Sequence, residues 1–352
     1  MRVLVALSGG VDSSVAAALL VAEGHEVVGA TMKLWGGASD SGCCSVADVD
    51  DARRAATRIG IDHHVFNFTE EFSARVVVPY VEAHGAGLTP NPCIECNRHL
   101  KFRSFLDRAS RLGFDAVATG HHARVVPGDE PRLLRGEDVR KDQSYVLSCL
   151  TAAELRRLLL PIGHLDKTAV RALAAELGLP TAGKPDSQDV CFVLQGTGAG
   201  ARERFLSERL ELHPATVVDH TSGEVLGEVP AVELVTVGQR RGLNVGGGER
   251  RFAVRIDVGR RLIEVGKEAD LMADGVVLGE RTWVRAPLPA GSEVMAQSSA
   301  HGRPAKAVLV GDGLLFGERR RRVAPGQTVA LYVGDEVVGS GIVRPGDVGA
   351  AA

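Results

Sequence analysis

The sequence lacks the long apolar run that would mark a membrane protein. None of its hydrophobic stretches reaches the roughly 20 residues that span a bilayer. The apolar start, Met1 to Leu7, has no basic leader and no small-residue cleavage site, which disfavours a secretory signal. We therefore expect a cytoplasmic protein. Its 352 residues are enough for two or three domains.

An excess of charge of one sign is also missing. The formal net charge is only −3, so global charge gives no indication of a nucleic-acid partner. Any RNA would have to be bound by local basic patches. Candidates are the arginines at 240–241, 250–251, 260–261 and 319–322. For any single pair, a solvated surface is the simpler explanation.

Cysteines are few for a disulfide framework. The chain has six of them, at positions 43, 44, 93, 96, 149 and 191. A large cytoplasmic protein keeps its thiols reduced, which leaves chemistry, metal binding or burial as explanations. Cys149 lies in an apolar helical stretch, Ser144 to Leu150, and is expected in the core.

The first part of the chain alternates strand-like apolar runs with amphipathic helices. Strands are expected at 3–7, 25–32, 64–68 and 116–119, and helices at 11–23, 46–59, 71–83, 98–112 and 168–177. This alternation predicts a parallel sheet with helices on both faces. The fold class is therefore α/β, with a doubly wound N-terminal domain.

After about residue 205 the chain changes to short β-branched runs between Gly, Pro and Asp turns. The runs lie at 215–218, 234–237, 253–258, 263–265, 276–278, 294–297, 305–310, 328–333 and 337–343. They predict antiparallel β domains, a small β-rich central one and a barrel-like one at the C-terminus. We place the three domains at residues 1–202, 203–271 and 272–348, followed by a disordered tail at 349–352.

The strongest motif is the loop Ser8-Gly9-Gly10-Val11-Asp12-Ser13-Ser14, between the first strand and the first helix. Ligands of α/β sheets bind at this carboxyl edge of the strands. The glycines allow the backbone to approach an anion closely, and the serines and helix-start amides supply donors. Asp12 would be stabilised at the helix start or would hold Mg²⁺. The loop has no Walker A lysine, which disfavours an ordinary P-loop NTPase.

Two segments place cysteines in unusual surroundings. Cys93 and Cys96 lie in Thr89-Pro-Asn-Pro-Cys-Ile-Glu-Cys-Asn97, where two prolines predict an extended segment before the helix at 98–112. A nearby helix start and basic neighbours would favour the Cys96 thiolate. Cys191 follows a Gly-Lys-Pro turn at 183–185, which would expose it at a domain edge.

Three explanations of these cysteines stay open. They could be a catalytic pair, they could bind a metal or an iron–sulfur cluster as a set of Cys93, Cys96 and Cys191, or they could be buried and inert. A complete zinc site would need a second CxxC or a CxxH partner, and the sequence shows none.

The motifs, taken in order, resemble the tRNA-specific 2-thiouridylase family of PP-loop ATP pyrophosphatases over nearly the whole chain. The matching segments are the loop at 8–14, Cys43-Cys44-Ser45, 89–97 with Lys101-Phe102, Ala118-Thr119-Gly120-His121, 141–145, 185–192, 237–243 and 324–327. No later motif is decisive alone, but their order and spacing together are specific.

The resemblance implies a sulfurtransferase that adenylates C2 of the wobble uridine in a tRNA anticodon arm, using ATP and Mg²⁺. Cys191 would carry a persulfide received from a cysteine desulfurase or a relay protein. Cys96 would attack that persulfide and leave a transient Cys96–Cys191 disulfide, which is ordinary thiolate exchange. We expect a monomer.

The resemblance also implies which residues of this chain bind ATP and which bind tRNA. Those implied for ATP are Ala6, Leu7, Ser8, Gly9, Gly10, Val11, Asp12, Ser13, Met32 and Gly120. Those implied for tRNA are Asn91, Pro92, Cys93, His121, Lys141, Asp142, Gln143 and Gln327. A satisfied histidine pair at a strand end is the plainer explanation of His121 and His122.

The chain departs from the family at two places. Many relatives have an aspartate, proposed as the general acid or base, where this chain has Cys93, so the proton-transfer step is left without a residue. Many also have an Arg-Tyr-Arg segment for tRNA contact where this chain reads 296–302, so no arginine contact is carried over there, and His301 or Arg303 would be the substitutes. The rival functions are an iron–sulfur-dependent thiolase on this fold and a small-molecule PP-loop synthetase.

Overall fold

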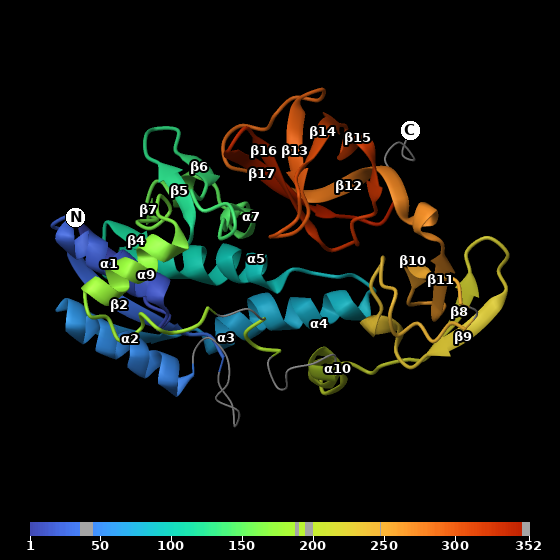
Figure 1. Ribbon diagram of the computed structural model, residues 1–352, viewed down its shortest axis with the longest axis horizontal. Helices are drawn as coiled ribbons and strands as arrows, with labels where there is room; N and C mark the ends of the chain where they lie inside the picture. Colours follow the sequence, from blue (N-terminus) through green and yellow to red (C-terminus); the bar gives the residue numbers. More distant parts are fainter. Residues whose placement is uncertain (36–44, 187–189, 194–199, 247, 347–352) are drawn as a thin grey trace.

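Three sheets follow one another along the chain in this computed structural model (Figure 1). The structure describes residues 1–35, 45–186, 190–193, 200–246 and 248–346. Cys43, Cys44 and the tail at 349–352 therefore lie outside the described residues. Within the described residues no helix is long and apolar enough to cross a membrane.

The N-terminal sheet has five parallel strands in the order β3-β2-β1-β4-β7. Their bounds are β1 Arg2–Ala6, β2 Glu26–Lys33, β3 Asp62–Asn67, β4 Ala116–Ala118 and β7 Leu158–Leu159. The strand order reverses between β1 and β4, and a doubly wound sheet binds its ligands at such a switch point. The loop at 8–14 leaves β1 at this position.

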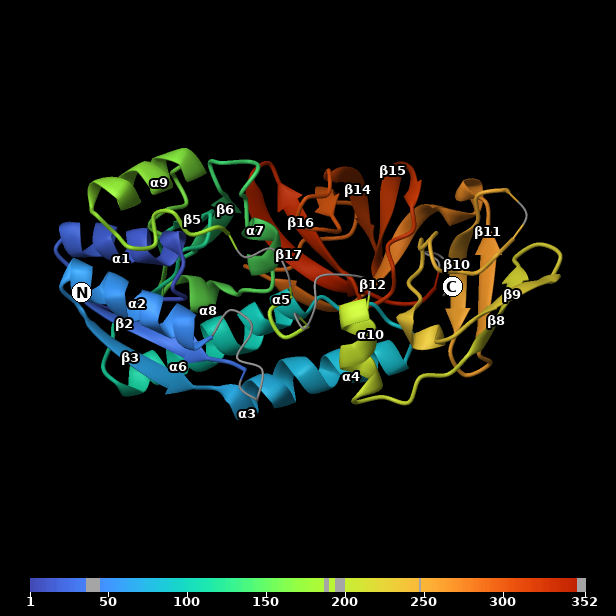
Figure 2. The ribbon, with the colours of Figure 1, turned by 60° about the horizontal axis from the view of Figure 1, so that its bottom comes forward.

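Helices cover both faces of this sheet, as the alternating pattern predicts. Figure 2 shows α1 (Val11–Ala22), α2 (Val46–Ile59) and α9 (Lys167–Glu176) on one side and α6 (Phe105–Arg111) on the other. The side chains of β1 divide accordingly, because neighbours in a strand point to opposite faces. Val3 and Val5 pack in the α1–α2 core, whereas Leu4 packs in the larger core on the other face. The α/β prediction is confirmed.

A long helical segment carries the two-cysteine motif. It runs through α5 (Pro92–Cys96), the π-helical turn η2 (Asn97–Ser104) and α6 without a break. The predicted extended conformation before residue 98 is therefore wrong. Pro92 occupies the first helical turn, where no backbone N–H is needed, and the Asn91 side chain accepts hydrogen bonds from Cys93 N and Ile94 N.

The remaining helical elements are short and connect these layers. They are α3 (Thr69–Phe72), η1 (Ser73–Val77), α4 (Val78–Gly85), α7 (Ser144–Leu147), α8 (Ala152–Leu155), α10 (Gly200–Ser207), η3 (Val232–Leu234) and η4 (Glu268–Leu271). Figure 1 shows α4 extending from the N-terminal domain beneath the C-terminal barrel toward the central sheet.

The central sheet is mixed, which corrects the antiparallel expectation. Its order is β10-β11-β8-β9, and β11 pairs with β8 in parallel. The bounds are β8 Ala215–Asp219, β9 Val225–Val229, β10 Phe252–Asp257 and β11 Leu262–Gly266. The strand expected at 234–237 is absent, because the 3-10 turn η3 ends at Leu234 and residues 235–237 form no strand. That turn buries the Glu233 carboxylate, which accepts hydrogen bonds from the His213 backbone N–H and pairs with its ring.

The C-terminal sheet closes into a six-stranded antiparallel barrel through pairing of β12 with β17. Its strands are β12 Met272–Trp283, β13 Glu293–Gln297, β14 Ala305–Val310, β15 Gly313–Arg321, β16 Thr328–Val333 and β17 Glu336–Val343. An N-terminal-domain hairpin, β5 (Ala123–Val126) with β6 (Arg132–Arg135), adds to it. Leu133 and Leu134 pair with Val337 and Glu336.

Arg135 stabilises the junction between the β5–β6 hairpin and the barrel. Its guanidinium donates to Asp142 at 2.9 Å and to Gln297 Oε1 at 3.0 Å, and it stacks 3.7 Å from the centroid of the Tyr332 ring. Asp142, Gln297 and Tyr332 are all buried. A charge removed from water needs its partner in place, so Arg135 holds the barrel against the N-terminal domain.

We predict that Arg135→Met lowers the free energy of unfolding by about 3–5 kcal/mol, because it leaves the Asp142 carboxylate buried without its cation. Arg132→Met is the matched control, since Arg132 is 45% exposed and lies 3.7 Å from Glu336. It should cost less than about 1 kcal/mol. Urea unfolding of both variants measures the difference, and equal losses would contradict this account.

Candidate functional site

The loop at 8–14 is shaped by its own hydrogen bonds. Ser13 Oγ accepts from the Ser8 backbone N–H at 3.2 Å and donates to the Gly10 carbonyl at 3.2 Å. Gly9 has a φ of 73°, and a Cβ there would strike the Asp48 backbone. Only glycine adopts this conformation without strain at so close an approach. The loop therefore curls over the start of α1, where backbone amides can receive an anion.

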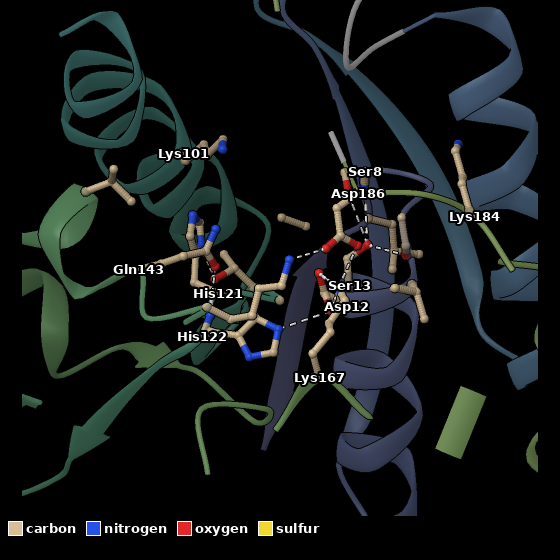
Figure 3. Close-up of a pocket in the computed structure, with 18 of the residues that line it drawn as sticks. Ser8, Asp12, Ser13, Lys101, His121, His122, Gln143, Lys167, Lys184 and Asp186 are labelled. Atoms are coloured by element: carbon tan, nitrogen blue, oxygen red, sulfur yellow. Dashed lines mark hydrogen bonds and ion pairs between the residues drawn. The ribbon is translucent and has the colours of Figure 1, made fainter. Parts of the chain in front are cut away.

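This loop forms one wall of a cavity of about 470 Å³. The strand ends contribute Ala6, Leu7, Thr31, Met32 and Leu34, and the loop contributes Ser8, Gly10, Val11, Asp12 and Ser13. The other walls are Asp48, Lys101, 119–122, Arg140, Lys141, Asp142, Gln143, Tyr145, Val146, Lys167, Lys184, Pro185, Asp186, Ala300 and His301. Figure 3 shows Ser8, Asp12 and Ser13 facing Lys101, His121 and Gln143 across the opening.

Gly120 lets β4 approach the loop. A Cβ at this position would lie 2.5 Å from both Asp12 C and Ser13 N. Such a contact involves backbone on both sides, so no larger residue fits. The glycine thus keeps the floor of the cavity open beside the amides at the start of α1.

Asp12 lies at the centre of a charged network in this wall (Figure 3). Lys167 Nζ contacts both of its carboxylate oxygens at 2.7 Å, and His122 Nε2 lies 3.2 Å from Oδ1. Burial works to raise the pKa of Asp12, but the hydrogen bonds and charges of His122 and Lys167 outweigh it and hold that pKa below its ordinary value. Asp12 is therefore a carboxylate at neutral pH.

Lys167 also binds Asp186, at 2.9 Å, and so bridges two segments 174 residues apart in sequence. Asp186 also forms ion pairs with Lys141, at 2.7 Å, and with Arg171, at 3.0 Å. Burial opposes the charge, yet hydrogen bonds from Lys141 and Lys167 lower the pKa of Asp186 to about 2. These ion pairs therefore hold the segment before Cys191 against the cavity wall that the loop at 8–14 forms.

Further contacts hold the same segment. The Arg171 guanidinium donates to the carbonyls of Ala182 and Lys184, at 2.8 and 3.0 Å. Lys184 in turn reaches the carboxylates of Asp48 and Asp51 on α2, at 2.6 and 2.7 Å. The residues before Cys191 therefore bind both α9 and α2.

His121 is a buried neutral imidazole. Burial is the main cause that lowers its pKa to about 3, and the positive charge of Lys101 adds to it. Its Nδ1 lies 2.7 Å from Thr119 Oγ1, and its ring packs 5.8 Å from that of Phe102. A satisfied, uncharged ring fits the plainer explanation of this histidine, although its edge lines the cavity.

The cavity gathers many of the residues expected for ATP and tRNA. It includes all expected ATP positions except Gly9, together with His121, Lys141, Asp142 and Gln143. Asn91, Pro92, Cys93 and Gln327 do not line it. Asn91 caps α5, and Gln327 donates to the Thr89 carbonyl at 2.6 Å, which joins the segment before α5 to the barrel domain.

The four described cysteines differ sharply in environment. Cys93 is exposed, Cys96 is buried, and Cys191 is half-buried against the core that contains Cys96. Cys149 is 2% exposed, and burial raises the pKa of its thiol to about 12, as expected for a core residue. Over the described ranges, no three His, Cys, Asp or Glu side chains form a metal-binding group. The iron–sulfur alternative remains a prediction.

Sequence reasoning missed Lys167, His122 as a partner of Asp12, and Lys184. Lys167 is the first residue of α9 and sits in no recognisable motif, so only the packing of α9 on α1 reveals it. Ala300 was also not assigned, because nothing in the sequence places a barrel turn at this cavity, and His301 was considered only as a substitute within the segment where relatives have Arg-Tyr-Arg.

These residues fit a nucleoside triphosphate. Loop amides and serine hydroxyls can receive its phosphates, Lys101, Lys167 and Arg140 supply positive charge, and the apolar Met32 and Leu34 suit a base. Asp12 and Asp186 are carboxylates of the kind that Mg²⁺ prefers. A bound Mg²⁺ would neutralise phosphate charge there.

Fold and loop together define an α/β nucleotide-binding protein that carries two β domains. Three known domain families match it: a tRNA methyl transferase HUP domain at residues 1–195, a tRNA methyl transferase PRC-barrel domain at 203–267 and an aminomethyltransferase beta-barrel domain at 275–343.

Curated relatives are similar over almost their full lengths. The tRNA-specific 2-thiouridylase MnmA of Chloroflexus aurantiacus is 46% identical over 358 residues, covering 98% of this chain and 99% of the relative. That of Rhodococcus jostii is 43% identical, covering 99% and 98%. The chain belongs to the tRNA-specific 2-thiouridylase MnmA family.

Similarity to solved structures is low. A 4-thiouridine synthetase–RNA complex with bound ATP is 21% identical, covers 54% of this chain and 44% of that chain, and has a TM-score of 0.35. An NMN synthetase from Francisella tularensis is 19% identical, covers 60% and 87%, and has a TM-score of 0.34.

We predict that Lys167→Met weakens ATP binding at least tenfold, because it removes a cation from the phosphate end of the cavity and leaves Asp12 without its closest partner. Arg171→Met is the control, since Arg171 also binds Asp186 but does not line the cavity. Titration calorimetry with ATP compares them. Equal loss of affinity in both variants would show that Lys167 acts only through Asp186.

The Asp186 network predicts a dependence of stability on acid. Because its folded pKa of about 2 lies below the ordinary 3.8, the network stabilises the fold above pH 4 and loses this effect as the pH falls from about 4 toward 2. The free energy of unfolding of Asp186→Asn should therefore be lower than that of the native chain at pH 6. The difference between the two proteins should become smaller toward pH 3. Urea unfolding across this range measures it, and a gap independent of pH would contradict the assignment.

Proposed function

We propose that this protein is a tRNA-uridine 2-sulfurtransferase. It would adenylate C2 of the wobble uridine with ATP, and then replace the C2 oxygen by sulfur from a cysteine persulfide. The observation that carries the proposal is the Ser8–Ser13 loop lining a nucleotide-sized cavity in a chain of this family. Neither Cys96 nor Cys191 lines that cavity, but Lys101, five positions after Cys96, and Asp186, five positions before Cys191, both do.

The cavity suits adenylation because the loop at one end would hold the phosphates while the other end would admit the uracil. The loop amides, Ser8 and Ser13 would hold the phosphates, while Lys167 would balance charge that develops as pyrophosphate leaves. The uracil oxygen would attack the α-phosphate from the side of Lys101 and Gln143, opposite the loop (Figure 3). Adenylation makes C2 electrophilic and turns its oxygen into part of a good leaving group, AMP.

Asp12 and Asp186 would hold Mg²⁺, which supplies charge neutralisation on the phosphates when bound. Both side chains are ionised at neutral pH, and both face the cavity. Lys167 lies between these two carboxylates and would add positive charge beside the phosphates. The chain's own part in this step is to orient the triphosphate and to exclude water.

Sulfur transfer would use Cys191 and Cys96. The terminal sulfur of a Cys191 persulfide attacks C2, and AMP leaves with the former carbonyl oxygen. The Cys96 thiolate then attacks the Cys191 sulfur, which releases the transferred sulfur on the base and forms a Cys96–Cys191 disulfide. Two electrons from an external thiol reductant restore both thiols. Helix residues beyond Cys96 reach the cavity at Lys101, and Asp186 precedes Cys191 by five positions.

The RNA side of the proposal rests on the residues expected for tRNA. Lys141, Asp142, Gln143 and His121 line the cavity, and Asn91, Pro92, Cys93 and Gln327 surround the α5 start beside the barrel. The target base would leave its stack to enter, as base-modifying enzymes require. Cys93 is given no role in proton transfer, since an ordinary thiol is a far weaker acid than the carboxyl it replaces.

We infer the setting from this chemistry. The enzyme would act in the cytoplasm as a monomer, where tRNA, ATP and reducing thiols are available, and it would receive sulfur from a cysteine desulfurase or a relay protein. An iron–sulfur cluster on Cys93, Cys96 and Cys191 is the alternative to the persulfide, and the following experiment separates the two.

We predict that the purified protein, given tRNA, ATP, Mg²⁺ and a persulfide donor, adds one sulfur to the wobble uridine. Cys96→Ser and Cys191→Ser should each lose at least 100-fold in rate, because neither can complete the thiol exchange. Nucleoside mass spectrometry measures the product. Cys149→Ser is the control and should keep its rate, since that thiol is buried and protonated.

Full thiolation by both Cys96→Ser and Cys191→Ser would overturn the two-cysteine mechanism. Cluster chemistry would be indicated instead by activity that follows the iron content of anaerobic preparations and that is also lost in Cys93→Ser. Pyrophosphate release on a small acid without tRNA would favour a small-molecule synthetase.

A further inference from the structure

Cys191 occupies the middle of a tight turn. The Val193 backbone N–H donates to the Val190 carbonyl at 3.0 Å, which closes the turn over four residues. Cys191 and Phe192 are its two central residues, and residues 190–193 belong to no helix or strand. The place of the Cys191 thiol therefore depends on how the side chains of this turn pack.

The Phe192 side chain anchors the turn in the core. It is 5% exposed, and four aromatic rings contact it, with centroids 5.2 to 6.1 Å from its own. This aromatic cluster consists of Trp35 after β2, Phe72 in α3, Tyr80 in α4 and Phe205 in α10. Buried rings in contact stabilise one another beyond the area that they bury. A ring packed against four others has little freedom to move.

The aromatic cluster is itself held in place. Tyr80 and Phe205 pack on each other at 6.2 Å, where α4 and α10 lie side by side (Figure 2). The Arg209 guanidinium stacks 4.1 Å from the centroid of the Phe205 ring. Tyr80 also packs on His84, whose Nδ1 lies 3.3 Å from the Glu233 carbonyl oxygen in the central domain. Phe192 is thus attached to a well-supported part of the core.

Both thiols of the proposed exchange meet this core. Cys96 is a buried member of the hydrophobic cluster that contains Phe192, and Cys191 is half-buried against it. Consecutive Cα atoms lie about 3.8 Å apart, so an anchored Phe192 confines the Cys191 thiol to a small volume at this surface. Two thiols exchange efficiently only when both are held close, because fixed geometry raises their effective concentration.

We propose that Phe192 is a positioning residue that holds Cys191 for thiol exchange with Cys96. This inference rests on the proposed function and adds to it the residue that presents the persulfide cysteine to its partner. Phe192 does not line the cavity, so ATP binding and adenylation do not involve its ring. A ring with a purely structural role would contribute to folding stability alone, without changing the relation between the two thiols.

Disulfide formation in glutathione redox buffers tests this role without tRNA or ATP. One glutathione disulfide is reduced to two thiols as Cys96 and Cys191 are oxidised to a disulfide, and peptide mass spectrometry identifies the pair. In Phe192→Ala the effective concentration of the two thiols should fall at least tenfold. Phe192→Leu keeps an apolar side chain in the aromatic cluster and should recover part of the loss.

Thiolation kinetics provide the second measurement. Phe192→Ala should lower kcat for thiolation at least tenfold, with the KM for ATP, the KM for tRNA and the first turnover of pyrophosphate release unchanged. Phe114→Ala is the matched control, since Phe114 is 8% exposed in the same core but packs on the Arg2 guanidinium. It should keep the native kcat and the native effective concentration of the two thiols. Circular dichroism confirms that each variant is folded.

An unchanged effective concentration in Phe192→Ala, or an equal fall in Phe114→Ala, overturns the assignment. A native chain that forms no Cys96–Cys191 disulfide in these buffers overturns it as well. Absence of thiolation by the native chain instead overturns the proposed function, and the redox measurement still decides whether Phe192 positions Cys191.

Discussion

The site depends on one cation placed between two carboxylates. Lys167 lies against Asp12 in the loop and against Asp186 in the segment that leads to Cys191. Without it, two negative groups would face each other across a partly buried wall. The position of Lys167 follows from the packing of α9 on α1, so the helical layer above the sheet determines the electrostatics of the cavity below.

A second constraint joins the domains. Arg135 contacts an acid, an amide and an aromatic ring, and these belong both to the N-terminal domain and to the barrel. Each of its partners is buried, so the junction has little freedom to slide. The cavity is consequently a composite, with a barrel turn forming part of its rim. Tyr145 strengthens the arrangement by donating to the Thr328 carbonyl in the barrel at 3.0 Å.

Local patterns in the sequence were enough to predict the α/β sheet, the helices on both faces and the position of the loop at 8–14 between the first strand and the first helix. Alternation and capping act over a few residues, which is why these predictions succeeded. Pro92 misled the prediction of an extended segment, because proline is tolerated in the first turn of a helix. The parallel pairing of β11 with β8 also escaped detection, since no local signal specifies which strands become neighbours.

The residues of the site also differ in whether a local signal in the sequence marks them. The motif at Ser8 to Ser13 is contiguous and could be recognised in the sequence, whereas the role of Lys167 and the place of His301 beside the cavity could not. Lys167 lies 155 positions from Asp12, and the barrel turn lies beyond another domain, so only the folded chain brings them to the cavity. The contribution of Cys93 stays a prediction, because exposure on α5 alone does not define its chemistry.

The pairing of β6 with β17 also constrains how the chain can be divided. In the intact protein Leu133 and Leu134 have strands on both sides, and Leu133 is fully buried. A fragment ending before the barrel would leave β6 as a sheet edge with unpaired backbone groups and would uncover Leu133. Such edges recruit strands from other molecules, and the expected result is self-association. The barrel therefore covers the edge that the β5–β6 hairpin would otherwise expose.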